Sequence, residues 1–392
     1  MRSFRIGSAL GIPIKLDITF LLILPVFAWL IGSQVGLWAD FLNDTWTLGL
    51  DGAALTTGAL PWILGAAAAV GLFACVTLHE LGHSAVAIRY GYPIDSITLW
   101  LLGGIAQLSD QPEDWRHELL IAIAGPVVSV LLGVLSFVAV FVIPQGVDAL
   151  RFLFGYLALV NVALAAFNLL PGFPMDGGRV LRALLARTRP FARATQIAAE
   201  VGKAVAILMG LVGLFGGNLI LVAIAFFIFI GASGESKRTV MNAAFQNVRV
   251  EDVMTPAPDL DTVPADATVA ELVDEMFRLR HTGFPVERDG RIVGMVTLDD
   301  ARDIRPVERD AYRVEEVMST ELYTVPRYGN PMAALDTMQG NGVGRLLVVD
   351  ENGAVVGLLS RTDLMTAFDV ITSRGAGPAG GRPGDDAESR PL

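Results

Sequence analysis

The chain is short of cysteine and lysine and carries no excess of positive charge. Cys75 is the only cysteine among the 392 residues, which excludes an intrachain disulfide. It stands one turn before His79 in an apolar run, where a lone cysteine is far more often packing material than a thiolate ligand. The 29 Lys and Arg are outnumbered by 40 Asp and Glu, for a net charge of −11. This acidity argues against a nucleic-acid partner, which would require a basic face.

The negative charge is concentrated in the C-terminal part of the chain. Residues 1–233 contain 12 Lys and Arg against 13 Asp and Glu, whereas residues 234–392 contain 17 against 27. Hydrophobic residues make up 53% of the chain, and the mean hydropathy is +0.54. Because the long apolar runs crowd the first part, the sequence predicts an integral membrane protein with a soluble region attached.

Six apolar runs are suited to membrane helices, at roughly 20 residues per crossing. They cover residues 17–33, 61–88, 119–143, 151–170, 197–214 and 218–233. The first run lacks a small-residue cleavage site, so we expect a retained span and not a removed signal peptide. Lys and Arg gather before the first run and after the second and fourth, which the positive-inside rule assigns to the cytoplasm. The sequence predicts a multi-pass cell-membrane protein with both termini cytoplasmic, and Arg151 is the one basic residue at odds with this.

An H-E-x-x-H motif, formed by His79, Glu80 and His83, lies in the second apolar run. On a helix the two histidines fall on one face, so both imidazoles can reach one Zn²⁺ while Glu80 stands beside them as a general base. Ionisable residues in a span are costly and are functional by default. The alternative is a pair of histidines satisfied within a helix bundle. Counting back from Arg89 places His79 roughly 15 Å below the cytoplasmic boundary.

A catalytic zinc requires three protein ligands and an open position for water. The fourth apolar run ends in FNLLPGFPMDGGR, where Asp176 follows two helix-breaking prolines, Pro171 and Pro174. Non-helical backbone at that depth is tolerated only where it is buried in protein or lines a polar cavity. Asp176 is therefore the candidate third ligand, and the alternative of an exposed turn aspartate fits the context poorly.

Three elements resemble the site-2 protease family of intramembrane zinc metalloproteases. They are HELGH at 79–83, LLGGIAQL at 101–108 and NLLPGFPMDGG at 168–178, in a hydrophobic setting that extends the resemblance from residue 1 to about 232. The resemblance implies that His79, His83 and Asp176 bind one Zn²⁺ and that Glu80 activates the water.

Asn168 matches the asparagine that the family carries eight positions before the aspartate. Its amide N–H could donate to the oxyanion of the tetrahedral intermediate, which makes Asn168 a candidate catalytic residue. The alternative is a structural amide that caps or bridges helices in the bundle.

Residues 92–108, YPIDSITLWLLGGIAQL, alternate in polarity and carry β-branched residues and glycines. The pattern predicts a small β-hairpin at the cytoplasmic interface, whose edge could receive an unwound substrate segment by strand addition. An ordinary re-entrant connector is the alternative, because isolated strand patterns are ambiguous.

The C-terminal part contains an internal repeat. RVEDVMT at 249–255 recurs as RVEEVMS at 313–319, and GMVTLDD at 294–300 recurs as GLLSRTD at 357–363. Repeats of this kind indicate tandem copies of one unit. Each copy is expected to contain a helix, two strands joined by a turn, and a last helix. The two copies resemble a pair of CBS domains.

This second resemblance implies an adenine nucleotide, ATP, ADP or AMP, bound at the pair. The hydroxyls of Thr297 and Ser360 can bond phosphate oxygens, and Asp300 and Asp363 can accept from ribose hydroxyls, with a helix N-terminus nearby. Many such pairs bind nothing, so the motif leaves binding open. A homodimer through the CBS pair is a further expectation.

The predicted fold class is a polytopic α-helical membrane protein with about six transmembrane helices and a small interfacial β-hairpin or sheet, followed by an α/β tandem CBS pair. We assign residues 1–233 to a transmembrane zinc protease domain, 234–248 to a linker, 249–306 and 312–371 to the CBS domains, and 373–392 to a disordered tail. The tail is rich in Gly, Pro and charge and lacks apolar periodicity.

The leading hypothesis is a zinc-dependent intramembrane metalloendopeptidase. It would cut membrane-protein substrates within or near their transmembrane segments, as in regulated intramembrane proteolysis of a membrane-bound regulator such as an anti-sigma factor, with nucleotide at the CBS pair modulating it. The alternatives are a nucleotide-gated transporter or channel with a metal site, and a catalytically inactive scaffold. Glu80 discriminates between the classes, because a transporter needs no base between the two histidines.

Overall fold

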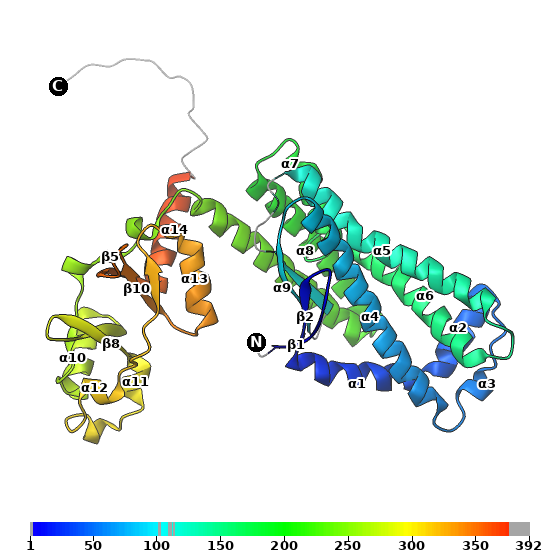
Figure 1. The fold of residues 1–392 in the computed structure, drawn as a ribbon, viewed down its shortest axis with the longest axis horizontal. Coiled ribbons are helices and arrows are strands. Elements are labelled where there is room, and N and C mark those ends of the chain that lie inside the picture. The colour runs from blue at the N-terminus through cyan, green and yellow to red at the C-terminus, as the bar shows by residue number, and fades with distance from the viewer. Residues whose placement is uncertain (1–2, 101–102, 109–111, 113, 376–392) are drawn as a thin grey trace, which may run out of the picture. The chain divides into compact units, whose positions relative to one another are not determined.

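The computed structural model describes residues 3–100, 103–108, 112 and 114–375. The chain divides into two units, residues 1–237 and 238–392. The first holds the apolar helices and one small sheet, and the second holds the repeated copies (Figure 1). The predicted fold class is confirmed, whereas the domain boundaries stay a prediction. Most of the expected disordered tail, residues 376–392, lies outside the described residues.

Five helices of the first unit are long and apolar enough to cross a membrane. They are α4 (Leu60–Arg89), α5 (Trp115–Val142), α6 (Asp148–Asn168), α8 (Phe191–Phe215) and α9 (Leu219–Ala244). A sixth span results if α1 (Ile18–Ser33) and α2 (Val35–Trp46), bent by 63° at Gln34, count as one. The sequence predicts α1 but not α2, which packs Val35, Ala39 and Leu42 into an apolar cluster with Phe152 of α6. Two short helices, α3 (Gly52–Leu55) and α7 (Asp176–Ala186), complete the unit.

Small residues bring the neighbours of α4 close to it. Added Cβ atoms would lie 2.3 Å from the Ala28 carbonyl oxygen of α1 at Gly65, 3.1 Å from Leu157 of α6 at Gly71, and 2.7 Å from Val128 of α5 at Gly82. Helices in a membrane associate through close packing of this kind, since lipid supplies no hydrophobic drive between them. The helix that carries the H-E-x-x-H motif is therefore fixed on three sides, and α4, α5 and α6 lie side by side (Figure 1).

A four-stranded sheet lies beside these helices. Its order is β1 (Ser3–Ala9), β2 (Ile12–Asp17), β3 (Ile94–Trp100) and β4 (Gly103–Leu108), with β2 and β3 parallel and the other pairs antiparallel. The hairpin expected at 92–108 is present as β3 and β4. The N-terminal hairpin, which turns at Leu10 and Gly11 with φ of 52° and 80°, is not among the elements expected from the sequence. Such a two-residue turn suits the twist of paired strands.

Arg151, the exception to the positive-inside pattern, is an internal structural residue. Only 7% of it is exposed, and its Nη2 donates to the Leu48 carbonyl oxygen at 2.8 Å. Asp148 lies 3.8 Å from its Nη1 and also accepts from the Asp51 backbone N–H at 3.2 Å. The arginine therefore ties the segment after α2 to the start of α6.

The second unit contains two similar copies. The first has α10 (Val269–Leu279), β7 (Gly283–Arg288), β8 (Arg291–Thr297) and α11 (Leu298–Arg302), and the second has α13 (Pro331–Gly340), β10 (Arg345–Val349), β11 (Val355–Ser360) and α14 (Arg361–Gly375). Short strands β5 (Thr255–Pro256), β6 (Val263–Pro264) and β9 (Thr324–Pro326) complete two sheets, ordered β6-β7-β8 and β5-β11-β10-β9. Four single-turn helices, Val250–Asp252, Ala257–Asp259, Pro306–Glu308 and Val314–Val317 (α12), join these elements.

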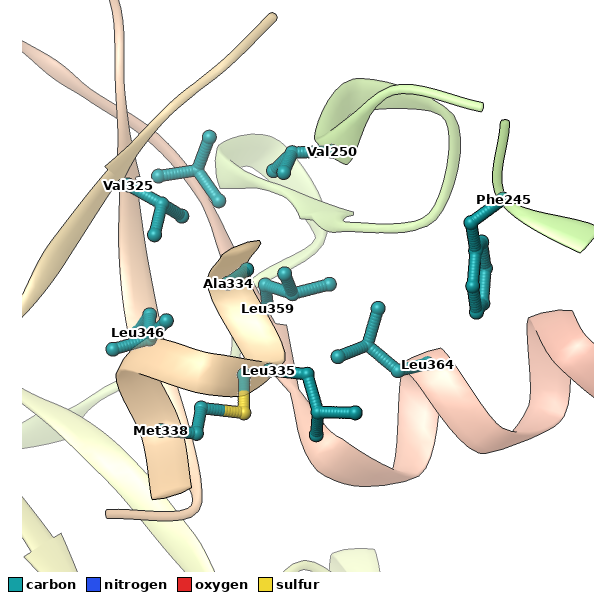
Figure 2. Close-up of a cluster of buried hydrophobic side chains, with 10 residues drawn as sticks. Phe245, Val250, Val325, Ala334, Leu335, Met338, Leu346, Leu359 and Leu364 are labelled. Atoms are coloured by element: carbon teal, nitrogen blue, oxygen red, sulfur yellow. The ribbon is translucent and has the colours of Figure 1, made fainter. Parts of the chain in front are cut away.

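The copies exchange their leading segments. Strand β5 precedes the first copy but pairs with β11 of the second, while Ser319, which leads the second copy, bridges Met295 of the first. The core of the second copy is likewise completed from outside, because Phe245 and Val250 are buried among its side chains (Figure 2). Phe245 follows directly after α9, which continues as one helix through residues 234–244 of the expected linker.

We expect Gly65→Ala to destabilise the membrane unit. The new Cβ would meet the backbone of α1, which cannot yield as a side chain can, so the two helices would have to separate at a cost of about 1–3 kcal/mol. Gly210→Ala in α8 is the matched control, because its Cβ would make an ordinary 3.5 Å contact with Ala225. Thermal unfolding in detergent should show a lower midpoint for the first variant alone. Equal midpoints would contradict this account of the α1–α4 packing.

Candidate metal centre

The three predicted zinc ligands meet in the interior of the first unit. His79 and His83 are 3% and 4% exposed, and their Nε2 atoms lie 3.2 Å apart. Each Nε2 is 3.1 Å from Oδ2 of Asp176. Within the described residues this is the one group of His, Cys, Asp or Glu side chains that could hold a metal ion. Cys75, though buried, is not part of it.

Helix α5 orients both imidazole rings. His83 Nδ1 lies 2.7 Å from the Ile121 carbonyl oxygen, and His79 Nδ1 lies 2.8 Å from the Ser129 hydroxyl. Because a carbonyl only accepts, His83 carries its proton on Nδ1, which leaves Nε2 with a free lone pair aimed at Asp176. Histidine ligands of metals are commonly held in this way by a partner on the other ring nitrogen. Neither partner could be expected from the sequence, since nothing local marks Ser129 or a backbone carbonyl.

The donor set fits Zn²⁺. Two imidazoles and one carboxylate with a fourth position open is a ligand set of catalytic zinc sites. Ligand atoms about 2.0–2.1 Å from a tetrahedrally coordinated Zn²⁺ lie about 3.3 Å from one another. The 3.1, 3.1 and 3.2 Å separations here agree with that spacing. The site therefore matches the ion in atom type, number and separation.

Two glycines border the motif where a side chain would collide with it. A Cβ on Gly125 of α5 would lie 2.2 Å from Nε2 of His83 and 2.7 Å from Nε2 of His79. A Cβ on Gly104 of β4 would lie 2.4 Å from Cγ of Glu80. No local signal in the sequence marks Gly125 as a neighbour of the two histidines. Strand β4 in turn runs beside Glu80, which is half-buried.

Asp176 is positioned by the tightly packed segment between α6 and α7. It is the first residue of α7, and the two glycines that follow it lie against backbone: a Cβ on Gly177 would be 2.2 Å from the Leu170 carbonyl oxygen, and one on Gly178 would be 2.4 Å from Phe173 N. Gly172 approaches Gly202 of α8 equally closely. The segment is thereby fixed from α7 and from α8.

Asn168 is the last residue of α6 and is half-buried. Among the described residues it makes no hydrogen bond to His79, His83 or Asp176. Its predicted role at the oxyanion stays a prediction.

The candidate nucleotide residues of the second unit lie at two helix N-termini. Thr297 donates from its backbone N–H and hydroxyl to Asp300 Oδ2, each at 2.7 Å, and Ser360 and Asp363 repeat the arrangement at 2.8 Å. These pairs cap α11 and α14. Thr297 and Asp300 also line a cavity of about 540 Å³ together with Arg345, whereas Ser360 and Asp363 do not.

Apolar helices around a His2Asp group, with Glu80 beside the two histidines, fit a membrane-embedded metalloprotease, which here is joined to a repeated α/β module. Comparisons with known proteins agree with this class. The model of peptidase family M50 matches residues 67–152 and 145–209, and the CBS domain model matches 250–306 and 314–370. The candidate ligands His79 and His83 fall with Glu80 inside residues 67–152, and Asp176 falls inside residues 145–209.

Full-length relatives are similar over almost the whole chain. A zinc metalloprotease of Methanocaldococcus jannaschii is 34% identical over 94% of this chain and 97% of its own length. A putative zinc metalloprotease of Mycobacterium tuberculosis is 36% identical over 80% of this chain and 84% of its own. A solved site-2 protease structure from M. jannaschii shares 36% identity, covers 60% of this chain and 95% of that one, and has a TM-score of 0.43.

The chain belongs to peptidase family M50. It is an intramembrane zinc metalloendopeptidase with a C-terminal pair of CBS domains. The hypothesis of a zinc-dependent intramembrane metalloendopeptidase is thus confirmed.

Replacing Gly125 tests the geometry of the centre. Gly125→Ala should lower the bound zinc per chain severalfold, because the new methyl group would occupy the space against both Nε2 atoms. Gly133→Ala on the same helix is the control, since its nearest contact would be a Val162 side-chain atom at 3.2 Å. Atomic emission on purified protein measures the metal content. Full zinc content in the Gly125 variant would refute the proximity argued here.

Proposed function

We propose that His79, His83 and Asp176 hold the catalytic zinc and that Glu80 is the general base of peptide hydrolysis. The observation that carries this is the convergence of both Nε2 atoms and Asp176 Oδ2 within 3.1–3.2 Å of one another. Such convergence in an apolar bundle is costly unless a cation or shared protons satisfy the groups. When bound, Zn²⁺ supplies the Lewis acidity that polarises a carbonyl and makes water nucleophilic near neutral pH.

The protein residues then move the proton and orient the substrate. Glu80 takes a proton from the attacking water and returns it to the leaving amine. Asn168, at the end of α6, donates its amide N–H to the oxyanion that develops on the scissile carbonyl. The imidazole rings do not turn during the reaction, because Ser129 and the Ile121 carbonyl hold them.

Strand β4 receives the substrate in this proposal. A transmembrane helix must lose internal hydrogen bonds before it can be cut, and free backbone groups in lipid are costly. Strand β4 is the last in the order of the described sheet, so its outer edge can replace some of those bonds by strand addition. The approach of Gly104 to Glu80 supports this arrangement, since it brings the same strand to the base.

We further propose that the termini and the CBS pair are cytoplasmic and that the substrate is a membrane-bound regulator such as an anti-sigma factor. The arginines that flank the second and fourth apolar runs support this orientation. The internal bonding of Arg151 removes the exception. We retain 1–233, 249–306 and 312–371 as the functional domains, and a homodimer through the CBS pair.

An adenine nucleotide bound at the CBS pair would modulate the protease. The cavity of about 540 Å³ is lined by side chains suited to phosphate, namely Arg302, Arg345, Thr282 and Thr297, and also by the carboxylates of Asp299, Asp300 and Glu321. Arg345 donates to the Thr282 hydroxyl at 2.9 Å, which joins the second copy to the first at the cavity wall. The family match to CBS domains is consistent with such a ligand.

We expect Glu80→Gln to abolish cleavage while zinc remains bound, because the substitution removes the base and leaves the three ligands. His79→Ala should lose both activity and metal. Cleavage of a reconstituted single-pass substrate and zinc content are measured in parallel, with a chelator and with Glu200→Gln, an exposed acidic residue of α8, as controls. Cleavage that persists in Glu80→Gln or in the presence of the chelator would contradict zinc-dependent hydrolysis with Glu80 as the base.

Nucleotide binding to the full chain should raise its unfolding temperature. A ligand at 100 times its Kd contributes about 2.7 kcal/mol. ATP, ADP and AMP are compared for the native chain, for Arg345→Ala, which should abolish the shift, and for Arg278→Ala, a variant of an exposed arginine outside the cavity. The absence of a shift with all three nucleotides would remove the modulation hypothesis.

A further inference from the structure

Three charged residues that the mechanism does not use meet beside the metal centre. Arg182 of α7 is 4% exposed, and its Nε donates to Oε1 of Glu118 of α5 at 2.6 Å. Its Nη1 donates to Oε1 of Glu235 of α9 at 2.9 Å. Glu118 is fully buried. Buried ion pairs are costly to form and costly to break, so a triad of this kind fixes its partners in one geometry.

The same guanidinium lies between two aromatic rings. Its Cζ is 4.9 Å from the ring centroid of Phe173 and 4.7 Å from that of Phe191. Phe173 belongs to the segment that ends at Asp176, and Phe191 begins α8. Arg182 therefore contacts both the segment that leads to the third ligand and the start of α8. Cation–π contacts of this kind stabilise the position of the guanidinium in addition to the ion pairs when water is excluded.

The position of Asp176 relative to the histidines depends on this cluster. Arg182 lies six residues after Asp176 on the same helix, less than two turns away. Its partner Glu118 is on α5, the helix whose Ile121 carbonyl and Ser129 hydroxyl orient His83 and His79. One salt bridge thus ties the helix of the third ligand to the helix that orients the other two.

Helix α9 contributes Glu235 to this cluster and also packs against the segment that ends at Asp176. Besides Glu235, it presents Gly231, where a Cβ would lie 2.9 Å from Cγ of Pro174, and Ala232, which is buried with Phe173. Gly231 and Ala232 lie against the segment that ends at Asp176, and Glu235, about one turn further along the same helix, contacts Arg182 of α7. A shift of α9 would therefore move that segment or break the Glu235 contact.

We propose that Arg182 is a positioning residue of the metal centre. Through Glu118 it sets the place of Asp176 against the two histidines, and through Glu235 it makes that place depend on α9. The inference rests on the proposed ligand set of His79, His83 and Asp176. It concerns residues that touch neither metal nor substrate, so its effect should appear in the geometry and affinity of the site.

The test is a cobalt titration of the full-length protein after removal of its metal. Co²⁺ replaces Zn²⁺ in such sites, and its visible absorption bands report the coordination geometry. Arg182→Lys, which cannot keep both forked contacts, and Glu235→Gln, which keeps shape but loses charge, are compared with the native chain. Glu200→Gln is the control, because that residue pairs with Lys203 on the exposed face of α8.

We expect the Co²⁺ affinity to fall about 10-fold or more in Arg182→Lys and severalfold in Glu235→Gln, with altered absorption bands in both and no change in the control. The cleavage rate at saturating substrate should fall with little change in KM. Native affinity and native bands in both variants would overturn the inference. If Arg182→Lys does not fold, Glu235→Gln decides alone on the same readouts.

A failure of the underlying ligand set looks different. His79→Ala is titrated alongside, and an unchanged Co²⁺ affinity in that variant would show that the metal binds elsewhere. That outcome contradicts the proposed function and removes the basis of the inference with it. Loss of Co²⁺ in His79→Ala, combined with weakened Co²⁺ in the Arg182 and Glu235 variants, supports both.

Discussion

The cost of holding ionisable groups in an apolar helix bundle is the constraint on which the rest of this structure depends. Two imidazoles and a carboxylate can persist there only if each polar atom has a partner. The Nε2 atoms of the two histidines face Asp176, and their Nδ1 atoms hydrogen-bond to the Ser129 hydroxyl and to a backbone carbonyl oxygen. Gly125 and Gly104 serve this arrangement, because they let α5 and β4 approach the motif.

The long apolar helices and the meeting of the candidate ligands could be predicted because both leave local signatures. Apolar length marks a span, and histidines one turn apart mark a shared face. Asp176 could be predicted as a candidate ligand because its proline and glycine context breaks a helix at membrane depth. The two CBS copies could be predicted because the repeat is visible in the sequence alone.

Long-range pairings left no such signal. Glu118 and Arg182 are 64 positions apart, and no periodicity connects them. The parallel pairing of β2 with β3, the bend between α1 and α2, and the exchange of leading segments between the CBS copies all depend on tertiary contacts that override local pattern. Gly125 illustrates the limit, because its sequence context fits close packing while only the structure shows that its neighbours are the ligand nitrogens.

Phe245 has a consequence for how this protein can be divided. It follows the last membrane helix directly, yet its ring is 1% exposed and lies among the side chains of the second CBS copy, 6.4 Å from the ring of Phe368. An excised CBS pair that begins at the repeat, near residue 249, leaves that place in its core empty. A protease fragment that ends after Phe245 carries the unpartnered ring with it. The boundary that the repeat suggests, near residue 249, therefore does not divide the chain without removing part of the core of the second CBS copy.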